Sequence, residues 1–170
     1  MSNQPPPKRS AAEAEKPVTS PPWQSEAGQG NQRYKAKSKN RKVSAYEGLQ
    51  KNIRLLKAPR IEVWKNQYPD KSYTICLDIP EFTCICPKTG LPDFANIKIE
   101  YSPDKYCIEL KSFKLYTIFY RNIGIFHEHV INKILDDFVN AVSPCWVKIS
   151  GIFNPRGGIT TTVSAEWRRP

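Results

Sequence analysis

The chain has 170 residues and a formal net charge of +10, which suits one ordinary domain, or one small domain with a tail. Residues 1–60 hold thirteen Lys or Arg against four Asp or Glu, whereas residues 61–170 hold thirteen against twelve. Because nearly all of the excess charge lies in the first third, the total does not indicate a nucleic-acid-binding domain in the remainder.

Residues 1–58 are predicted to be a disordered basic tail. The first 32 residues contain two proline runs and few branched aliphatic side chains, so they cannot bury enough apolar surface to offset their conformational entropy. Residues 33–42 (RYKAKSKNRK) are a basic cluster. Such a cluster is typical of a solvated tail, and a weak contact with RNA or another polyanion is the alternative interpretation.

The sequence predicts a cytosolic protein. The N-terminus lacks the apolar segment of a signal peptide, and no stretch approaches the roughly 20 apolar residues of a membrane span. The five cysteines are an odd number in a chain without a secretory signal, which indicates reduced thiols rather than a disulfide framework.

Residues 59–170 are predicted to form the folded domain, beginning with a strand over 72–79 that Pro80 stops. After a loop at 87–93, apolar and polar residues alternate over 95–101, which predicts a second strand. A turn at 102–105 then leads to residues 106–111, which are expected to return as the other strand of a hairpin.

Two helices and two strands are predicted to follow. Ser112 is expected to cap a short helix that runs to residue 121. An apolar stripe at helical spacing predicts a helix over 126–142, and strands are expected over 146–153 and 158–167. The order β-β-α-α-β-β places the domain in the α+β class. The open sheet edges favour pairing with another copy of the chain.

Cys86 lies in a loop, directly before Pro87 and seven residues before Asp93. A loop thiol with a nearby carboxyl group can serve as a nucleophile with a proton donor, although a small packing residue is the alternative interpretation. Cys84 and Cys86 could form half of a zinc site, but no second Cys-x-x-Cys or Cys-x-x-His pair completes it.

Further candidate residues stand at the predicted starts of the helices. Lys111 and Lys114 are three residues apart and could bind phosphate groups together with Arg156, or simply be solvated. Glu128 flanks the apolar stripe of the second helix. Its carboxylate could accept hydrogen bonds from a guanine-like base, or it could merely complement the helix dipole.

Four of these segments together resemble the short, single-domain 7-cyano-7-deazaguanine reductases of queuosine biosynthesis. The resemblance covers residues 59–167. Its segments are Glu-Leu-Lys-Ser-Phe-Lys-Leu-Tyr at 109–116, Cys-Pro-Lys-Thr-Gly-Leu-Pro-Asp-Phe at 86–94, Phe-His-Glu at 126–128 and Pro-Arg-Gly-Gly at 155–158. Residues 1–58 are outside it.

The resemblance implies a tunnelling fold, in which subunits join edge to edge into a barrel with active sites between them. It also implies the conversion of 7-cyano-7-deazaguanine to its aminomethyl form by two NADPH. Cys86 would form a covalent thioimide, Asp93 would supply a proton, and His127 would position the substrate or transfer protons. The implied substrate-binding residues are Glu128, Glu109 and Phe126, and the implied cofactor-binding residues are Lys111, Ser112, Lys114, Arg156 and Gly157.

Two other functions fit parts of the sequence. An amidine-forming relative on the same scaffold would use the same Cys and Asp and release the thioimide with an amine, but it would not need the 109–116 segment. A basic RNA-binding module would need positive charge in the folded domain, and that charge is confined to the predicted tail. No metal is expected.

Overall fold

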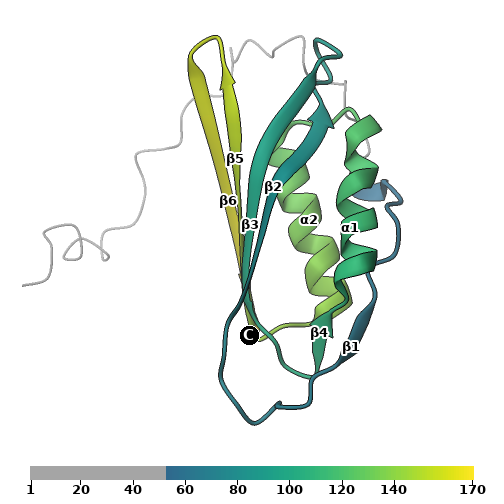
Figure 1. Ribbon diagram of the computed structural model, residues 1–170, viewed down its shortest axis with the longest axis vertical. Coiled ribbons are helices and arrows are strands. Elements are labelled where there is room, and N and C mark those ends of the chain that lie inside the picture. The colour runs from purple at the N-terminus through teal and green to yellow at the C-terminus, as the bar shows by residue number, and fades with distance from the viewer. Residues whose placement is uncertain (1–52) are drawn as a thin grey trace, which may run out of the picture. The chain divides into compact units, whose positions relative to one another are not determined.

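The computed structural model describes residues 53–170, which form a four-stranded antiparallel sheet with two helices on one of its faces (Figure 1). The strand order is β2-β3-β5-β6, and the short strands β1 and β4 pair separately. The elements are η3 (Ile53–Leu55), β1 (Val63–Lys65), β2 (Ile75–Ile85), β3 (Pro92–Ser102), β4 (Tyr106–Ile108), α1 (Leu110–Phe119), η4 (Tyr120–Asn122), α2 (His127–Val142), β5 (Trp146–Arg156) and β6 (Ile159–Arg168). The predicted α+β class and the β-β-α-α-β-β arrangement of the sheet and its helices are confirmed.

The core lies between the sheet and the two helices. In β3, Ile97, Ile99 and Tyr101 are fully buried, whereas Lys98 and Glu100 on the opposite face are exposed. This alternation follows from the two-residue period of a strand. The apolar stripe of α2 covers the buried face, and the Tyr101 and Phe138 rings meet edge to face with their centroids 4.9 Å apart.

The strand β2 passes through Pro80 and ends at Ile85, so the prediction that Pro80 stops it is wrong. The register with β3 shifts between Ile79 and Phe82, which absorbs the residue that cannot donate to the ladder. β2 is also an edge strand, where proline is tolerated. As a consequence, Cys84 pairs with Asp93 across the ladder.

The predicted hairpin between 95–101 and 106–111 is also wrong. β3 pairs with β2 and β5, whereas β4 is only three residues long and pairs with β1. The cap prediction at Ser112 is wrong as well, because Glu109 is the N-cap of α1. Its carboxylate accepts from the backbone N–H of Lys111 (2.8 Å) and of Ser112 (2.6 Å), which satisfies two amides at the start of the helix.

The predicted tail falls almost wholly outside the described residues, and with it the 33–42 cluster. The last part of that segment is described. Ile53, Leu56 and Ala58 pack against the core, so the packed region begins before the expected boundary at residue 59. None of the described helices is long and apolar enough to cross a membrane.

The turn between β5 and β6 consists of Gly157 and Gly158, both with positive φ (56° and 80°). A two-residue hairpin of this kind needs left-handed backbone, which glycine adopts at little cost. The turn is shorter than the predicted 154–157 segment. Arg156 therefore stands at the end of a strand, where its position is fixed by the ladder to Ile159.

Candidate active site

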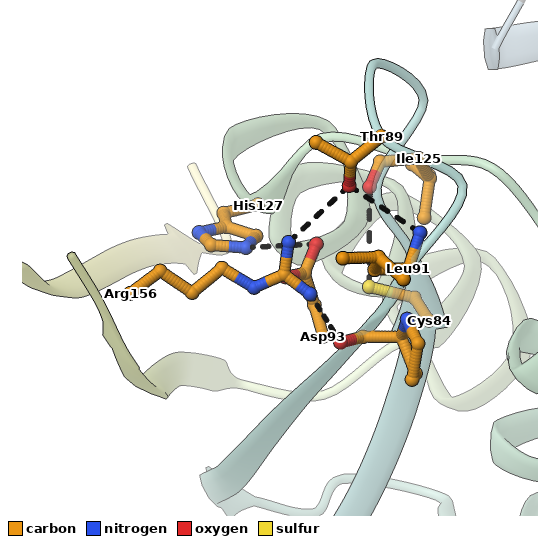
Figure 2. Close-up of polar contacts among 8 residues, drawn as sticks. Cys84, Thr89, Leu91, Asp93, Ile125, His127 and Arg156 are labelled. Atoms are coloured by element: carbon orange, nitrogen blue, oxygen red, sulfur yellow. Dashed lines mark hydrogen bonds and ion pairs between the residues drawn. The ribbon is translucent and has the colours of Figure 1, made fainter.

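Three predicted site residues meet around one carboxyl group at the end of the sheet. Asp93 lies near the start of β3 and its side chain is only 5% exposed. Arg156 donates from Nε to Asp93 Oδ1 at 2.8 Å, and His127 Nε2 lies 3.4 Å from Oδ2 (Figure 2). One oxygen of this buried carboxyl group therefore contacts the guanidinium, and the other faces the histidine.

Arg156 does not stand free for a phosphate in this subunit. Besides Asp93, its guanidinium contacts the Pro92 carbonyl oxygen and Thr89 Oγ1 (Figure 2). These contacts connect the end of β5 to the loop that follows Cys86. The arginine that sequence reasoning assigned to the cofactor is thus a partner of the predicted proton donor.

His127 is held by a second contact that sequence reasoning missed. Its ring stacks on Phe153, with centroids 3.7 Å apart and 8° between the planes. Phe153 is a buried, inward-facing residue of β5, and the alternation of that strand was the only signal that placed it on the same face as the site. The stack and the Asp93 contact together fix the orientation of the imidazole.

Cys84 and Cys86 are two residues apart but have opposite tendencies to ionise. Burial raises the pKa of Cys84 to about 12, with the nearby charges of Asp93 and Cys86 adding to the effect. Burial also acts to raise the pKa of Cys86, but hydrogen bonds from the Thr89 side chain and from the backbone N–H groups of Thr89 and Lys88 bring it below its ordinary value. Because the thiolate is the reactive form, Cys86 is the nucleophile candidate and Cys84 a packing residue.

Phe126 and Glu128 stand at the start of α2, beside His127. Phe126 occupies the N-cap position without a side-chain cap, and its ring meets that of His129 edge to face. Glu128 is exposed. Its carboxylate has no hydrogen-bond or ion-pair partner among residues 53–170, since only its carbonyl oxygen is used, by Asn132. A free carboxylate near the nucleophile suits an anchor for a polar ligand.

Glu109, Lys111, Ser112 and Lys114 lie at the other end of the subunit, whereas Gly157 follows Arg156 in the β5–β6 turn. α1 begins beside the β1–β4 pair, whereas the loop that holds Cys86 is at the opposite end of the sheet (Figure 1). Lys111 and Lys114 are exposed there, and neither forms an ion pair within the described part of the chain. α1 has ten residues and is about 15 Å long at 1.5 Å per residue, and both lysines lie in its first half.

Glu109 and Ser112 have structural partners at this end. The Glu109 carboxylate caps α1, and the Ser112 hydroxyl donates to the Glu109 carbonyl oxygen and accepts from Glu62 N–H. Both side chains therefore fix the start of the helix that carries the two lysines. Within residues 53–170, no group of three or more His, Cys, Asp or Glu is placed to hold a metal ion.

Comparison with known proteins identifies relatives of this chain. A family model described as QueF-like protein matches residues 92–170, a range that includes Asp93, His127 and Arg156 and begins after Cys86. The NADPH-dependent 7-cyano-7-deazaguanine reductase of Nitrosococcus oceani is 54% identical over 110 residues, which are 65% of this chain and 85% of the relative. The protein of the same name from Chloroherpeton thalassium is 54% identical over 112 residues, covering 66% and 97%.

A solved structure is also similar. The crystal structure of the archaeosine synthase QueF-Like in the apo form aligns with a TM-score of 0.52 and 26% identity, over 55% of this chain and 91% of that one. The fold of this chain and the extent of the sequence match both agree with this likeness. The chain belongs to the family of NADPH-dependent 7-cyano-7-deazaguanine reductases.

Proposed function

We propose that this protein reduces the nitrile of 7-cyano-7-deazaguanine to an aminomethyl group at the expense of two NADPH. Its high identity to enzymes of that name, over most of their length, supports the assignment. The observation that carries it is local. Cys86, whose pKa is lowered by hydrogen bonds from Thr89 and Lys88, lies in the loop next to the buried carboxyl group of Asp93 and an oriented imidazole.

In the proposed reaction, Cys86 Sγ adds to the nitrile carbon and the nitrile nitrogen takes up a proton, which gives a covalent thioimide. We assign the proton to the His127–Asp93 pair, because His127 Nε2 and Asp93 Oδ2 are 3.4 Å apart and Arg156 holds the other oxygen of Asp93 in place. Each of the two NADPH molecules, when bound, supplies one hydride, and together the two hydrides reduce the thioimide carbon to the amine carbon. The thiol leaves after the first of them, which returns Cys86 to its starting state.

The residues present fit a phosphate-bearing cofactor at the start of α1. Lys111 and Lys114 are exposed, lie one turn apart and have no carboxylate partner within the described residues, so two cationic donors are available for phosphate oxygens. Glu109 and Ser112 would keep that helix start in place. Arg156 and Gly157 lie at the other end of the subunit. They could contact the same cofactor only if they came from another copy of the chain.

The separation of the two ends supports a site shared between copies. Within one subunit, the β2–β3 loop that begins with Cys86 and the start of α1 lie at opposite ends of the sheet-and-helix layer (Figure 1). A homo-oligomer in which the start of α1 of one copy meets the Cys86 loop of another would complete the site. The exposed edges of β2 and β6 are surfaces on which copies can pair.

We propose Glu128 as the anchor of the heterocycle and Phe126 as an apolar contact beside it. A carboxylate can accept hydrogen bonds from the ring N–H and the exocyclic amine of a guanine-like base. Glu128→Gln places a donor where an acceptor is needed, so substrate affinity should fall on the order of tenfold or more. Equal affinity of the variant and the parent in a calorimetric titration would remove Glu128 from this role.

The cytosol is the proposed location, since all five cysteines are free and reduced thiols are typical of that compartment. The test of the function is the stoichiometry of NADPH oxidation with purified protein and 7-cyano-7-deazaguanine. Two NADPH oxidised per aminomethyl product are expected. Substrate consumption without NADPH oxidation, but with an added amine, would instead identify the amidine-forming reaction.

A further inference from the structure

The loop after Cys86 is a tight turn closed on the nucleophile. Gly90 N–H donates to the Cys86 carbonyl oxygen at 2.9 Å, and Cys86 N–H donates to the Leu91 carbonyl oxygen at 2.8 Å. Gly90 has a φ of +69°, a left-handed conformation that glycine adopts without strain. The turn folds Thr89 back toward the cysteine from which the loop starts.

The Thr89 hydroxyl accepts two hydrogen bonds. Leu91 N–H donates to Thr89 Oγ1 at 3.3 Å, and Arg156 Nη1 donates to the same atom at 3.4 Å (Figure 2). A hydroxyl group has two lone pairs and one proton. Because both lone pairs have donors, the proton is directed away from them. The Thr89 side chain is among the groups that lower the pKa of Cys86, which leaves Cys86 Sγ as the remaining partner for this proton.

The charges near Cys86 do not explain a stable thiolate without these donors. Asp93, on β3, opposes a negative sulfur, and so does Cys84 on β2 if it ionises. Arg156, on β5, is already paired with Asp93, and His127, on α2, faces that same carboxylate. Lys88 contributes its backbone N–H from within the loop. Neutral hydrogen-bond donors are therefore the groups that favour the thiolate.

We propose that Thr89 is a positioning residue for the nucleophile, whose hydroxyl donates to Cys86 Sγ in an orientation fixed by Arg156 and Leu91. Such a hydrogen bond favours the thiolate over the thiol and fixes the direction of the sulfur. Arg156 therefore positions both reacting groups. It contacts Asp93 directly, and it orients Cys86 through Thr89. The inference rests on the proposed function in taking Cys86 as the nucleophile.

The test compares Thr89→Val, which keeps the shape and removes the hydroxyl, with Thr89→Ser, which keeps the hydroxyl. The pH dependence of iodoacetamide alkylation is followed at each cysteine by peptide mass spectrometry, without substrate or NADPH. In Thr89→Val the midpoint for Cys86 should rise by about one to two pH units, the worth of a hydrogen bond to a charged group. Thr89→Ser should titrate like the parent protein.

Two controls separate this effect from a general disturbance. Cys145 is exposed and should be alkylated with the same pH dependence in all variants. Thr83→Val removes a hydroxyl that donates to the Glu81 carbonyl oxygen in β2, and it should leave the Cys86 midpoint unchanged. Thr89 is exposed, so the substitution is compatible with folding, and Thr89→Ala provides a second variant without the hydroxyl.

An unchanged Cys86 midpoint in both Thr89→Val and Thr89→Ala would overturn the inference, and so would a Thr89→Ser variant that behaves like Thr89→Val. Adduct formation with 7-cyano-7-deazaguanine gives an independent measure. Thr89→Val should slow it roughly tenfold at neutral pH, with the difference closing at higher pH as the thiol ionises unaided. If the parent protein forms no adduct but the alkylation midpoints differ as expected, the proposed function fails and the role of Thr89 stands.

Discussion

The two ends of the subunit differ in whether their charged side chains contact one another. At the Cys86 end, Asp93, Arg156 and His127 contact one another, and the carboxyl group is nearly buried. At the start of α1, Lys111 and Lys114 are exposed and form no ion pair among the described residues, although the Glu109 carboxylate lies beside Lys111. The first arrangement is pre-organised for chemistry on a bound group, and the second is ready to receive an anion. One copy of the chain holds the two halves apart, and this is the basis of our proposal that a second copy completes the site.

The largest effect is expected at the reactive end, where the two neighbouring cysteines can be compared. Cys86→Ala should abolish NADPH oxidation, because no other described thiol is favoured as a thiolate beside Asp93. Cys84→Ala should retain activity and lose on the order of 1 kcal/mol of stability, since it removes a small buried side chain. Steady-state rates and thermal unfolding of both variants check this. An active Cys86→Ala enzyme would end the assignment of the nucleophile.

The lysine end should respond differently. Lys111→Gln with Lys114→Gln removes two charge-assisted contacts to phosphate, so the KM for NADPH should rise roughly tenfold per lysine. The rate of adduct formation without NADPH should not change, because that step needs only the other end of the sheet. If instead the double variant forms adduct slowly and keeps its KM, the lysines belong to the nucleophile and not to the cofactor.

Mixing the two kinds of variant would show whether the ends of different copies meet. Cys86→Ala has intact lysines, and the Lys111→Gln, Lys114→Gln protein has an intact cysteine. After mixed refolding or co-expression, random assembly should restore about a quarter of the sites if each site uses one end from each of two copies. Activity that stays at the sum of the separate variants would place the whole site within one subunit.

The smallest effect is expected from the helix cap that supports the lysines. The backbone N–H groups of Ser112 and Lys111 hold the pKa of Glu109 below its ordinary value. A depressed pKa means that the carboxylate stabilises the fold above its unfolded-state pKa, and that this contribution is lost as the pH falls through the folded-state pKa.

Glu109→Gln should therefore lower the unfolding midpoint by a few degrees at neutral pH, with the difference from the parent shrinking in acid. Glu81→Gln, at an exposed position of β2, is the control and should change the midpoint less. Thermal unfolding by circular dichroism at several pH values measures both. A difference that grows as the pH falls would contradict the capping role.

The sequence predicted the sheet class, both helices and the reactive loop because those features repeat at regular spacing or stand in a specific order. It did not predict that β2 continues past Pro80, since the bulge that absorbs the proline depends on the partner strand. The pairing of β4 with β1 was missed for a similar reason. Strands of three residues have too few side chains to show a period.

The candidate site was predictable as a set of residues but not as a set of contacts. The motifs named Asp93, His127 and Arg156 separately, and only the structure shows that Arg156 and His127 share one carboxyl group. Phe153 and Thr89 were not predicted as site residues, because a phenylalanine in a buried strand and a threonine in a loop are common and carry no sequence signal of a functional role. Their roles depend on which side chain lies beside them in space.

The central claim is that Cys86 forms a covalent intermediate that NADPH resolves. Intact-protein mass spectrometry after mixing with 7-cyano-7-deazaguanine tests it directly, first without and then with NADPH. We expect a mass increase equal to the whole nitrile, mapped to Cys86, that disappears as the aminomethyl product is released when NADPH is added. No adduct on the folded, reduced protein, an adduct on another cysteine, or one that NADPH does not discharge would contradict it.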